Sequence, residues 1–265
     1  MGTPTRMLGV DKGSGALTDI NTVSGKIRTS SMPYLYDIAE GNIADHTPVI
    51  INGYSGDVDA ADTTIADHSP NTQPYLTTAG TFEVGSSSSQ DGYTYTGALT
   101  MILRGLGGTW GHDTSTVTLS GASQVSTGTA LIRVMEAEVL TAGSSGKNAG
   151  TIDIRNGGNI FLRIDIGNNC SRAAIYTTAS GYTAYLVGGY VTAVNNKPSQ
   201  AKLTMRKFGG LFCVKAGAVL QDSGVSTSFY TPIEIPAKSD LEIRGTAVGG
   251  SGISDGVLFG WAEVA

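Results

Sequence analysis

The stretch from residue 151 to residue 166 decides the fold class: Thr151-Ile-Asp-Ile-Arg-Asn-Gly-Gly-Asn-Ile-Phe-Leu-Arg-Ile-Asp-Ile166. Apolar residues alternate with Asp or Arg on both sides of a Gly-Gly pair. Strict alternation is typical of a β-strand that has one face on a core and the other in water. We therefore expect two strands here. Their buried positions are Ile152, Ile154, Ile160, Leu162, Ile164 and Ile166.

Short segments of the same kind fill the chain from Gly80 onward, separated by Gly, Ser and Asn. Segment 131–140 fits a helix almost as well as a strand, and its neighbours favour a strand. The expected strands lie at about 98–104, 115–120, 131–140, 151–155, 160–166, 173–177, 183–194, 201–207, 211–215, 229–235, 240–246 and 256–264. The pattern predicts an all-β protein with an antiparallel, jelly-roll-like β-sandwich body over residues 79–265, with two subdomains dividing near residue 157 as an alternative.

The composition agrees with an all-β chain. Charged residues make up 15% of the 265 residues, while Gly alone contributes 37, which disfavours a helical bundle. Apolar residues make up 40%, enough to build a core. The net charge of −5 argues against nucleic acid or an anionic membrane as the partner of the whole protein.

Residues 1–78 differ from the rest, because they are polar, dotted with Pro and rich in acidic residues. We expect an extended, mostly irregular N-terminal arm. Val49-Ile-Ile51 followed by Asn52-Gly53 predicts one short strand that ends in a tight turn. Pro33-Tyr-Leu-Tyr36 is the first patch of the arm suited to contact a partner.

Charge is divided along the chain. No Lys or Arg lies between Arg28 and Arg104, a stretch with nine acidic residues, and no Asp or Glu lies between Asp165 and Asp222, a stretch with six basic residues. Complementary surfaces guide the register of an interface. We therefore hypothesise that the arm of one subunit lies along the basic face of another subunit or of a different partner protein, with the alternative that it wraps its own body. The candidate interaction residues are Tyr34, Tyr36, Asp57, Asp59, Asp62, Lys202, Arg206 and Lys207.

The arm contains a small repeat, since Ile43-Ala-Asp-His-Thr-Pro48 recurs as Ile65-Ala-Asp-His-Ser-Pro70. Asp before Ser/Thr-Pro favours a turn, because the carboxylate accepts backbone N–H groups and Pro blocks continuation. Two equivalent turns are the preferred interpretation. A metal site made from two Asp-His pairs is the alternative.

Sequence matches to catalytic motifs lack the required context. Gly252-Ile-Ser-Asp-Gly256 matches a nucleophile elbow, but a predicted strand follows where a helix is needed, so we expect a hairpin turn. Gly143-Ser-Ser-Gly-Lys-Asn148 is two residues short of a phosphate-binding loop. We predict no catalytic residues, no cofactor and no metal, and hence no enzyme.

Several stretches resemble a family of tailed-bacteriophage virion proteins, over about residue 35 to the C-terminus. They are Leu35–Pro48, Leu140–Arg155, Tyr176–Leu186 and Pro232–Arg244. The resemblance implies a virion structural protein that associates with itself, as a trimer or larger assembly, and with the major capsid protein or other virion proteins. Within that class we expect a capsid cement or decoration protein that stabilises the shell through its arm.

Two other functions stay open: a tail or head-fibre component, and a carbohydrate-binding β-sandwich with Trp110, Tyr93, Tyr95 or Tyr182 as the aromatic platform. The first residues lack the apolar core of a signal peptide, and no apolar run approaches a membrane-spanning length. We therefore expect assembly in the cytoplasm of the bacterial host and a final location in the virion, without membrane or nucleic-acid binding.

Overall fold

The computed structural model describes residues 33–68, 72–194, 198–247 and 252–265, together with two short strands at 8–10 and 17–19. Its described part contains one helix, α1 (Pro33–Ala39), and many strands that pair antiparallel in several sheets. The prediction of an all-β protein is confirmed.

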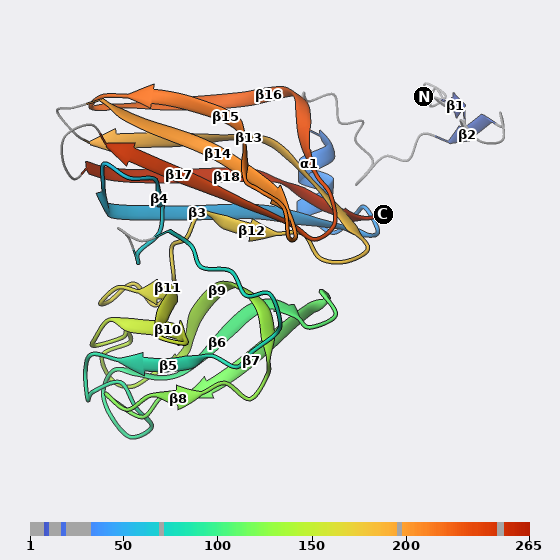
Figure 1. The fold of residues 1–265 in the computed structure, drawn as a ribbon. Coiled ribbons are helices and arrows are strands. Elements are labelled where there is room, and N and C mark those ends of the chain that lie inside the picture. The colour runs from blue at the N-terminus through green and yellow to red at the C-terminus, as the bar shows by residue number, and fades with distance from the viewer. Residues whose placement is uncertain (1–7, 11–16, 20–32, 69–71, 195–197, 248–251) are drawn as a thin grey trace, which may run out of the picture.

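The strands build two lobes that lie one above the other (Figure 1). The composite lobe joins two early strands, β3 and β4, to all strands from β12 onward, and the inserted lobe consists of β5 to β11. In the composite lobe the bounds are β3 His46–Val58, β4 Thr63–Thr64, β12 Ile175–Thr177, β13 Tyr182–Val194, β14 Ser199–Lys207, β15 Cys213–Leu220, β16 Ser223–Ile235, β17 Ser239–Ala247 and β18 Gly252–Val264. In the inserted lobe they are β5 Glu83–Ser86, β6 Ala98–Gly107, β7 His112–Thr118, β8 Val125–Ser126, β9 Leu131–Ala142, β10 Ile152–Asn156 and β11 Asn159–Ile164. The remaining pair, β1 (Leu8–Val10) and β2 (Leu17–Asp19), forms a small hairpin of its own.

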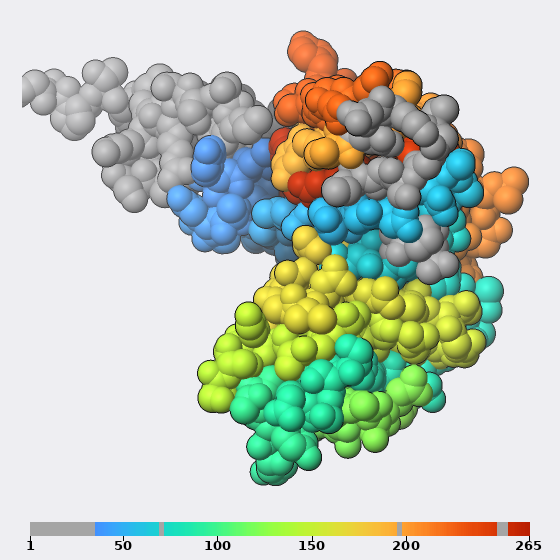
Figure 2. Space-filling model, turned by 90° about the vertical axis from the view of Figure 1, so that its left-hand side faces the viewer, coloured from blue at the N-terminus to red at the C-terminus, as the bar shows by residue number. Residues whose placement is uncertain are grey.

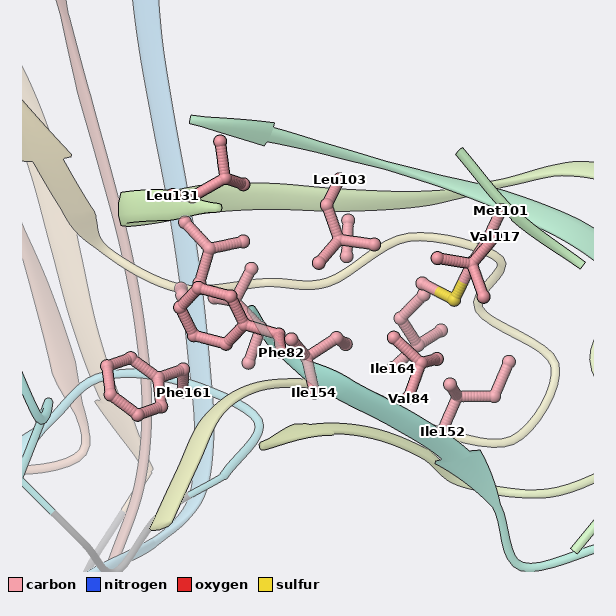
Figure 3. Packing of buried hydrophobic residues seen from close by; sticks show 14 of the residues in the cluster. Phe82, Val84, Met101, Leu103, Val117, Leu131, Ile152, Ile154, Phe161 and Ile164 are labelled. Carbon is pink, nitrogen blue, oxygen red and sulfur yellow. The ribbon is translucent and has the colours of Figure 1, made fainter. Parts of the chain in front are cut away.

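The inserted lobe has one core between its two sheets, β11-β10-β5-β8 and β7-β6-β9 (Figure 3). The rings of Phe82 and Phe161 meet edge to face, with centroids 5.0 Å apart. The alternation that predicted this lobe is confirmed at its centre, where Ile152, Ile154, Leu162 and Ile164 are fully buried. The prediction is wrong at Ile166, which is exposed because β11 ends two residues earlier.

The large core of the composite lobe also lies between two sheets, β16-β13-β18-β3 and β12-β17-β14-β15, with β4 paired to β17. Leu186 and Leu258 of the first sheet belong to the same buried cluster as Leu203 and Ile243 of the second. The predicted jelly roll is not found. A jelly roll has a single core, whereas the described strands of this chain surround two large buried clusters, one in each lobe.

Part of the predicted arm belongs to the body. Strand β3 pairs with β18 along nearly its whole length, and β4 pairs with β17. The turn expected at Asn52-Gly53 is wrong, because both residues lie in the middle of β3. Gly53 serves a close approach instead, since a Cβ atom there would lie 2.3 Å from the carbonyl oxygen of Ile65. Apart from β1 and β2, residues 1–32 lie outside the described part.

The chain crosses between the lobes twice, near residues 67–78 and again near residues 165–174. The crossings lie side by side, because Ala66 and Ala173 form an isolated antiparallel bridge. The division predicted near residue 157 is therefore displaced, since Gly157 and Gly158 form the turn of the β10–β11 hairpin. The outline of the molecule narrows where the lobes meet (Figure 2).

Candidate functional site

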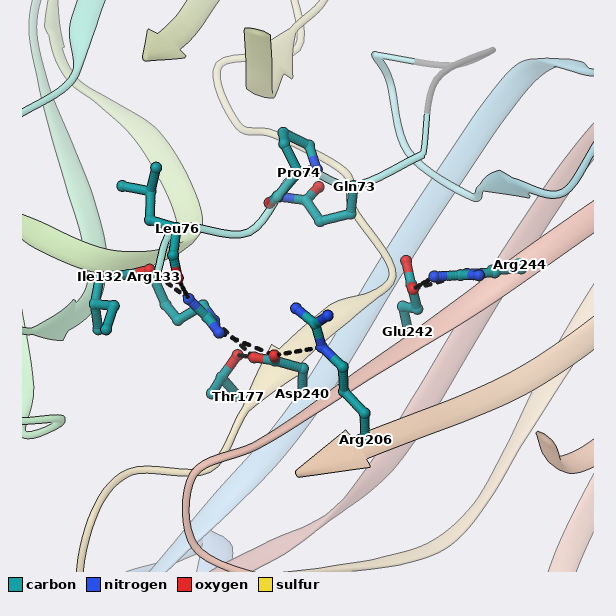
Figure 4. Close-up of polar contacts among 10 residues, drawn as sticks. All are labelled: Gln73, Pro74, Leu76, Ile132, Arg133, Thr177, Arg206, Asp240, Glu242 and Arg244. Carbon is teal, nitrogen blue, oxygen red and sulfur yellow. Dashed lines mark hydrogen bonds and ion pairs between the residues drawn. The ribbon is translucent and has the colours of Figure 1, made fainter. Parts of the chain in front are cut away.

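The junction of the two lobes is centred on a buried ion pair (Figure 4). Arg133, on β9 of the inserted lobe, donates from Nε to Oδ1 of Asp240 at 2.6 Å and from Nη2 to Oδ2 at 2.9 Å. Asp240 lies on β17 of the composite lobe, and both side chains are buried. A bidentate Arg–carboxylate pair fixes orientation as well as distance, so it sets how the lobes meet.

The Asp240 carboxylate accepts two further hydrogen bonds from its own lobe. Arg206 Nε donates to Oδ2 at 3.0 Å, and Thr177 Oγ1 donates to Oδ1 at 2.8 Å. The remaining Arg133 nitrogen donates to the carbonyl oxygen of Leu76 at 2.8 Å. Each charge in this group is thereby matched by polar partners, as a buried pair requires.

Aromatic rings close the junction around these guanidinium groups. The guanidinium carbon of Arg133 lies 5.0 Å from the ring centroids of both Tyr75 and Trp110, and that of Arg206 lies 4.4 Å from Tyr75. Burial raises the pKa of Tyr75 well above its ordinary value. The cavity beside this group measures only about 10 Å³. The part of the junction around Arg133 and Asp240 is therefore filled by protein atoms and leaves no room for a ligand.

The two crossings carry a second polar contact. Arg172 donates to Asp67 from its backbone N–H at 2.9 Å and from Nη2 at 2.7 Å. Burial raises the pKa of Asp67 to about 6, although the hydrogen bonds from Arg172 oppose the rise. Burial also lowers the pKa of the neighbouring His68 to about 4, and the charge of Arg163 adds to that effect.

The two copies of the Asp-His repeat are not equivalent. In the first copy Asp45 adopts a left-handed backbone, and His46 starts β3 and contacts Glu263 at 2.9 Å. In the second copy both side chains are buried at the crossings. Among the described residues no three His, Cys, Asp or Glu side chains gather as a metal site would require.

The structure pairs two of the candidate interaction residues within one chain. Lys202 Nζ lies 2.7 Å from Asp62 Oδ1, and Thr246 donates to the same oxygen at 2.6 Å. Burial alone would raise the pKa of Asp62, but these hydrogen bonds lower it below its ordinary value. Arg206 is likewise engaged internally, at the junction. These contacts match the alternative in which the segment wraps its own body.

The other candidate interaction residues are not brought together. Asp59 and Lys207 are exposed, and Asp57 lies on β3. Tyr36 lies on α1 with 60% of its surface exposed, and the side chain of Tyr34 lies outside the described part. Among those of them whose side chains the structure describes, no hydrogen bond or ion pair joins one to another.

Trp110, expected as a sugar platform, is 6% exposed and packs edge to face on Phe208 with centroids 4.7 Å apart. It was misjudged because a residue in a turn is normally exposed, whereas this turn is pressed against the other lobe. A larger cleft, of about 650 Å³, does lie between the lobes, and its lining includes Tyr176, Tyr182, His112 and Arg104.

One flank of the composite lobe is open. The two facing sheets end there in β15 and β16, and an apolar groove of about 190 Å³ lies between them. Small residues such as Gly189, Ala201 and Ala218 line it. Most residues of β15 and β16 are exposed, and no described strand pairs with the outer edge of either.

The sequence predicted strands on this flank, but it did not single the flank out as a site. A usable signal was present: residues 223–233 contain no charged residue. Natural proteins protect long edge strands with charges, prolines or bulges, so residues 223–228, which precede the bulge and Pro232 of β16, point to a partner once the edge position is known.

Comparison with known proteins gives only distant similarity. No protein-family description matches the chain, and no curated protein matches it. A structure of infectious bursal disease virus, Gt strain, is 13% identical with a TM-score of 0.22, over 87% of this chain and 77% of that one. A two-domain protein of unknown function from Bacteroides fragilis is 10% identical with a TM-score of 0.19, over 83% and 98%. The VP2 subviral particle of infectious bursal disease virus is 10% identical with a TM-score of 0.19, over 88% of this chain and 78% of that one.

At these TM-scores the comparisons establish neither a family nor a shared function. No helix in the described ranges is long and apolar enough to cross a bilayer.

Proposed function

We propose that this chain is a structural protein of a tailed-bacteriophage virion, which works by associating with copies of itself and with other virion proteins. The observation that carries the proposal is the open flank formed by β15 and β16. An exposed edge with a long uncharged run, such as residues 223–233 of β16, is a template for pairing with another chain, and a protein that assembles has a use for such an edge. The resemblance of residues 35–265 to phage virion proteins supports the same class.

The filled lobe junction supports a structural role as well. A subunit of a shell must hold its contact surfaces at fixed positions, and the Arg133–Asp240 pair fixes one lobe against the other. We propose no catalytic activity and no cofactor, and we assign the buried charges of Arg133 and Asp240 to this contact.

Within the virion class we propose a capsid cement or decoration protein on the outside of the head. The net charge of −5 suits an outer surface better than an interior lined with DNA. A tail or head-fibre component is the other candidate of the same class. Quantitative mass spectrometry of purified particles separates them, since hundreds of copies per particle indicate the shell and a dozen or fewer indicate the tail or a vertex. Absence of the chain from intact particles would contradict the proposal as a whole.

The role of the N-terminal segment in this proposal can be tested without damaging either lobe. Deleting residues 1–32 removes no strand of the composite or inserted lobe. If the segment ties neighbouring subunits together, the truncated protein binds particles more weakly, measured as copies retained after sedimentation. Unchanged retention at low and high salt would limit the function to the folded lobes.

A carbohydrate-binding module is a second candidate, favoured by the cleft between the lobes. Tyr182 and His112 pack ring to ring there at 5.6 Å, next to polar groups that include Asp113. Aromatic faces beside polar side chains are suited to a sugar ring. A glycan array is the direct test, and binding that Tyr182→Ala abolishes would favour this candidate over a purely structural role.

A further inference from the structure

We propose that β16 is a self-association surface, through which two copies of this chain pair edge to edge around a two-fold axis. The inference deepens the proposed function and rests on it for its biological sense, because it names the partner and the surface of self-assembly.

The shape of β16 makes it a projecting edge. Ser228 pairs with Gly188 of β13 and Ile233 pairs with Leu186, so the four residues Phe229-Tyr-Thr-Pro232 face a single residue of β13. This bulge lifts Tyr230 out of the sheet, where its side chain is fully exposed. The opposite end of the same sheet is different, because α1 contacts β3 there. The flank of β16 has no such cover among the described residues.

The chemistry of β16 identifies a second copy as the partner. A two-fold antiparallel pair places residues of one strand opposite residues of the identical strand, so any charged residue near the axis meets its own kind. Residues 223–233 carry no charge and include the strand formers Val225, Thr227 and Tyr230. Other long edges differ in this respect, since β15 carries Lys215 and β3 carries Asp57.

A different class of partner fits the surface less well. A nucleic acid or an anionic lipid surface needs Lys or Arg, which this strand lacks. An unrelated protein would gain register and selectivity from complementary charges, and β16 offers none before Glu234. Backbone pairing with an identical strand needs no charge.

The groove beside β16 supplies the apolar part of the contact. It opens between β15 and β16 and is lined by Val225, Phe229 and small residues of the facing sheet. An exposed apolar side chain of the partner, such as Tyr230, can bury its ring there. Backbone hydrogen bonds then give the pairing its direction, and the groove adds apolar burial.

Sedimentation of four purified full-length proteins tests the proposal: the unmodified chain, Tyr230→Asp, Val225→Asp and the control Tyr93→Asp. Tyr93 is 75% exposed and belongs to the inserted lobe, so the same charge is added away from β16. We expect the unmodified chain and the control to associate equally, and both β16 variants to dissociate about tenfold more readily or further. Circular dichroism of each variant verifies that the fold is intact.

Cross-linking gives an independent test of the geometry. In a chain with Cys170→Ser and Cys213→Ser, single cysteines introduced in turn over residues 223–230 should form a disulfide between copies only near one position, the two-fold axis. Cross-linking at no position, or a monomeric unmodified chain at every concentration tested, would overturn the proposal. So would association that neither β16 variant weakens.

The two proposals fail in different ways. If the chain is abundant in particles and the β16 variants enter them normally, the self-association surface is wrong and the virion function stands. If the chain pairs through β16 in solution but is missing from particles, the pairing stands and the virion function is wrong.

Discussion

The lobe junction and the β16 edge use opposite chemistry. At the junction, the buried Arg133 and Asp240 are paired, and the rings of Tyr75 and Trp110 lie against the guanidinium group of Arg133. At the edge, eleven residues in sequence, 223–233, carry no charge, and most of them are exposed. Both regions are rich in aromatic residues, so the difference lies in the polar groups.

This difference in polar groups separates contacts that one chain completes by itself from contacts that need a second chain. Buried charges are costly unless they are fully paired, so their partners are supplied by the same chain, at fixed geometry. Unpaired backbone groups at an edge cost little while water reaches them, and they stay available for a second chain. On this view the junction fixes the two lobes of one subunit against each other, and the β16 edge pairs with another subunit.

The largest expected effect is at the junction. Arg133→Ala removes both hydrogen bonds from the inserted lobe to Asp240 and leaves a buried carboxylate with fewer partners. Breaking a buried pair from one side typically costs about 3–5 kcal/mol. We expect a loss of this size in the free energy of unfolding, measured in urea.

The matched control is Arg104→Ala on β6 of the same sheet. Arg104 pairs with Glu136 and Glu138 at the surface, so its loss should cost under about 1 kcal/mol. If the two variants lose equal stability, the Arg133–Asp240 pair is not the principal contact between the lobes.

The next effect is a pH dependence at the two crossings. The folded pKa of His68 lies near 4, below the ordinary 6.5, so its contribution to stability is present above pH 6.5 and is lost as the pH falls toward 4. Asp67 acts in the opposite direction. Its folded pKa is raised from 3.8 to about 6, so its contribution is present below pH 3.8 and is lost as the pH rises through 6.

The two contributions oppose each other between about pH 4 and pH 6, so the unmodified chain should show little net change from this pair. His68→Asn should remove the contribution of His68 and leave that of Asp67. The free energy of unfolding should then rise on acidification, by up to about 3 kcal/mol. Asp67→Asn should leave only the contribution of His68, so the free energy of unfolding should fall on acidification. Urea unfolding at pH 7 and pH 4.5 measures both, and parallel pH profiles of all three proteins would contradict the assignment.

The fold could be predicted from the sequence wherever the pattern of apolar and polar residues within one strand determines which side chains are buried. The alternation of Ile152 and Ile154 predicted the inserted core correctly. The role of Gly53 could not be predicted, because Asn-Gly is a turn signal, and the close approach that requires glycine comes from Ile65, in the bend after β4. Likewise, Arg133 and Asp240 are 107 residues apart, and nothing local marks them as partners.

The candidate site shows the same limit. The charge division of the sequence led to the hypothesis of a contact between subunits, and the structure shows the contact of Asp62 with Lys202 within one chain. The uncharged run of β16 was visible in the sequence, yet its meaning depends on strand order. The absence of charge would be normal in a central strand. At the edge of a sheet, the same uncharged strand offers a surface for another chain.

A smaller effect is expected for the surface pair of Asp62 and Lys202, and it shows whether this pair acts within one chain or between subunits. Asp62 and Lys202 are partly exposed, so the pair should contribute about 0.2–1 kcal/mol, less at high salt. A double-mutant cycle with Asp62→Asn and Lys202→Met measures this coupling in the free energy of unfolding. A negligible coupling, together with salt-sensitive association of the subunits, would favour a charge contact between copies instead.

The smallest effect on folding is expected where the effect on association is largest. The Tyr230 side chain is fully exposed in the single chain, so Tyr230→Ala removes no buried contact and should change the free energy of unfolding by less than about 0.5 kcal/mol. Measured at protein concentrations low enough to keep the chain monomeric, this value isolates the subunit from its assembly. A loss of several kcal/mol in the monomer would mean that the bulge stabilises its own lobe, and the edge would then resemble the junction. A near-zero change combined with weakened association is the outcome expected of a residue whose partner is another copy of the chain.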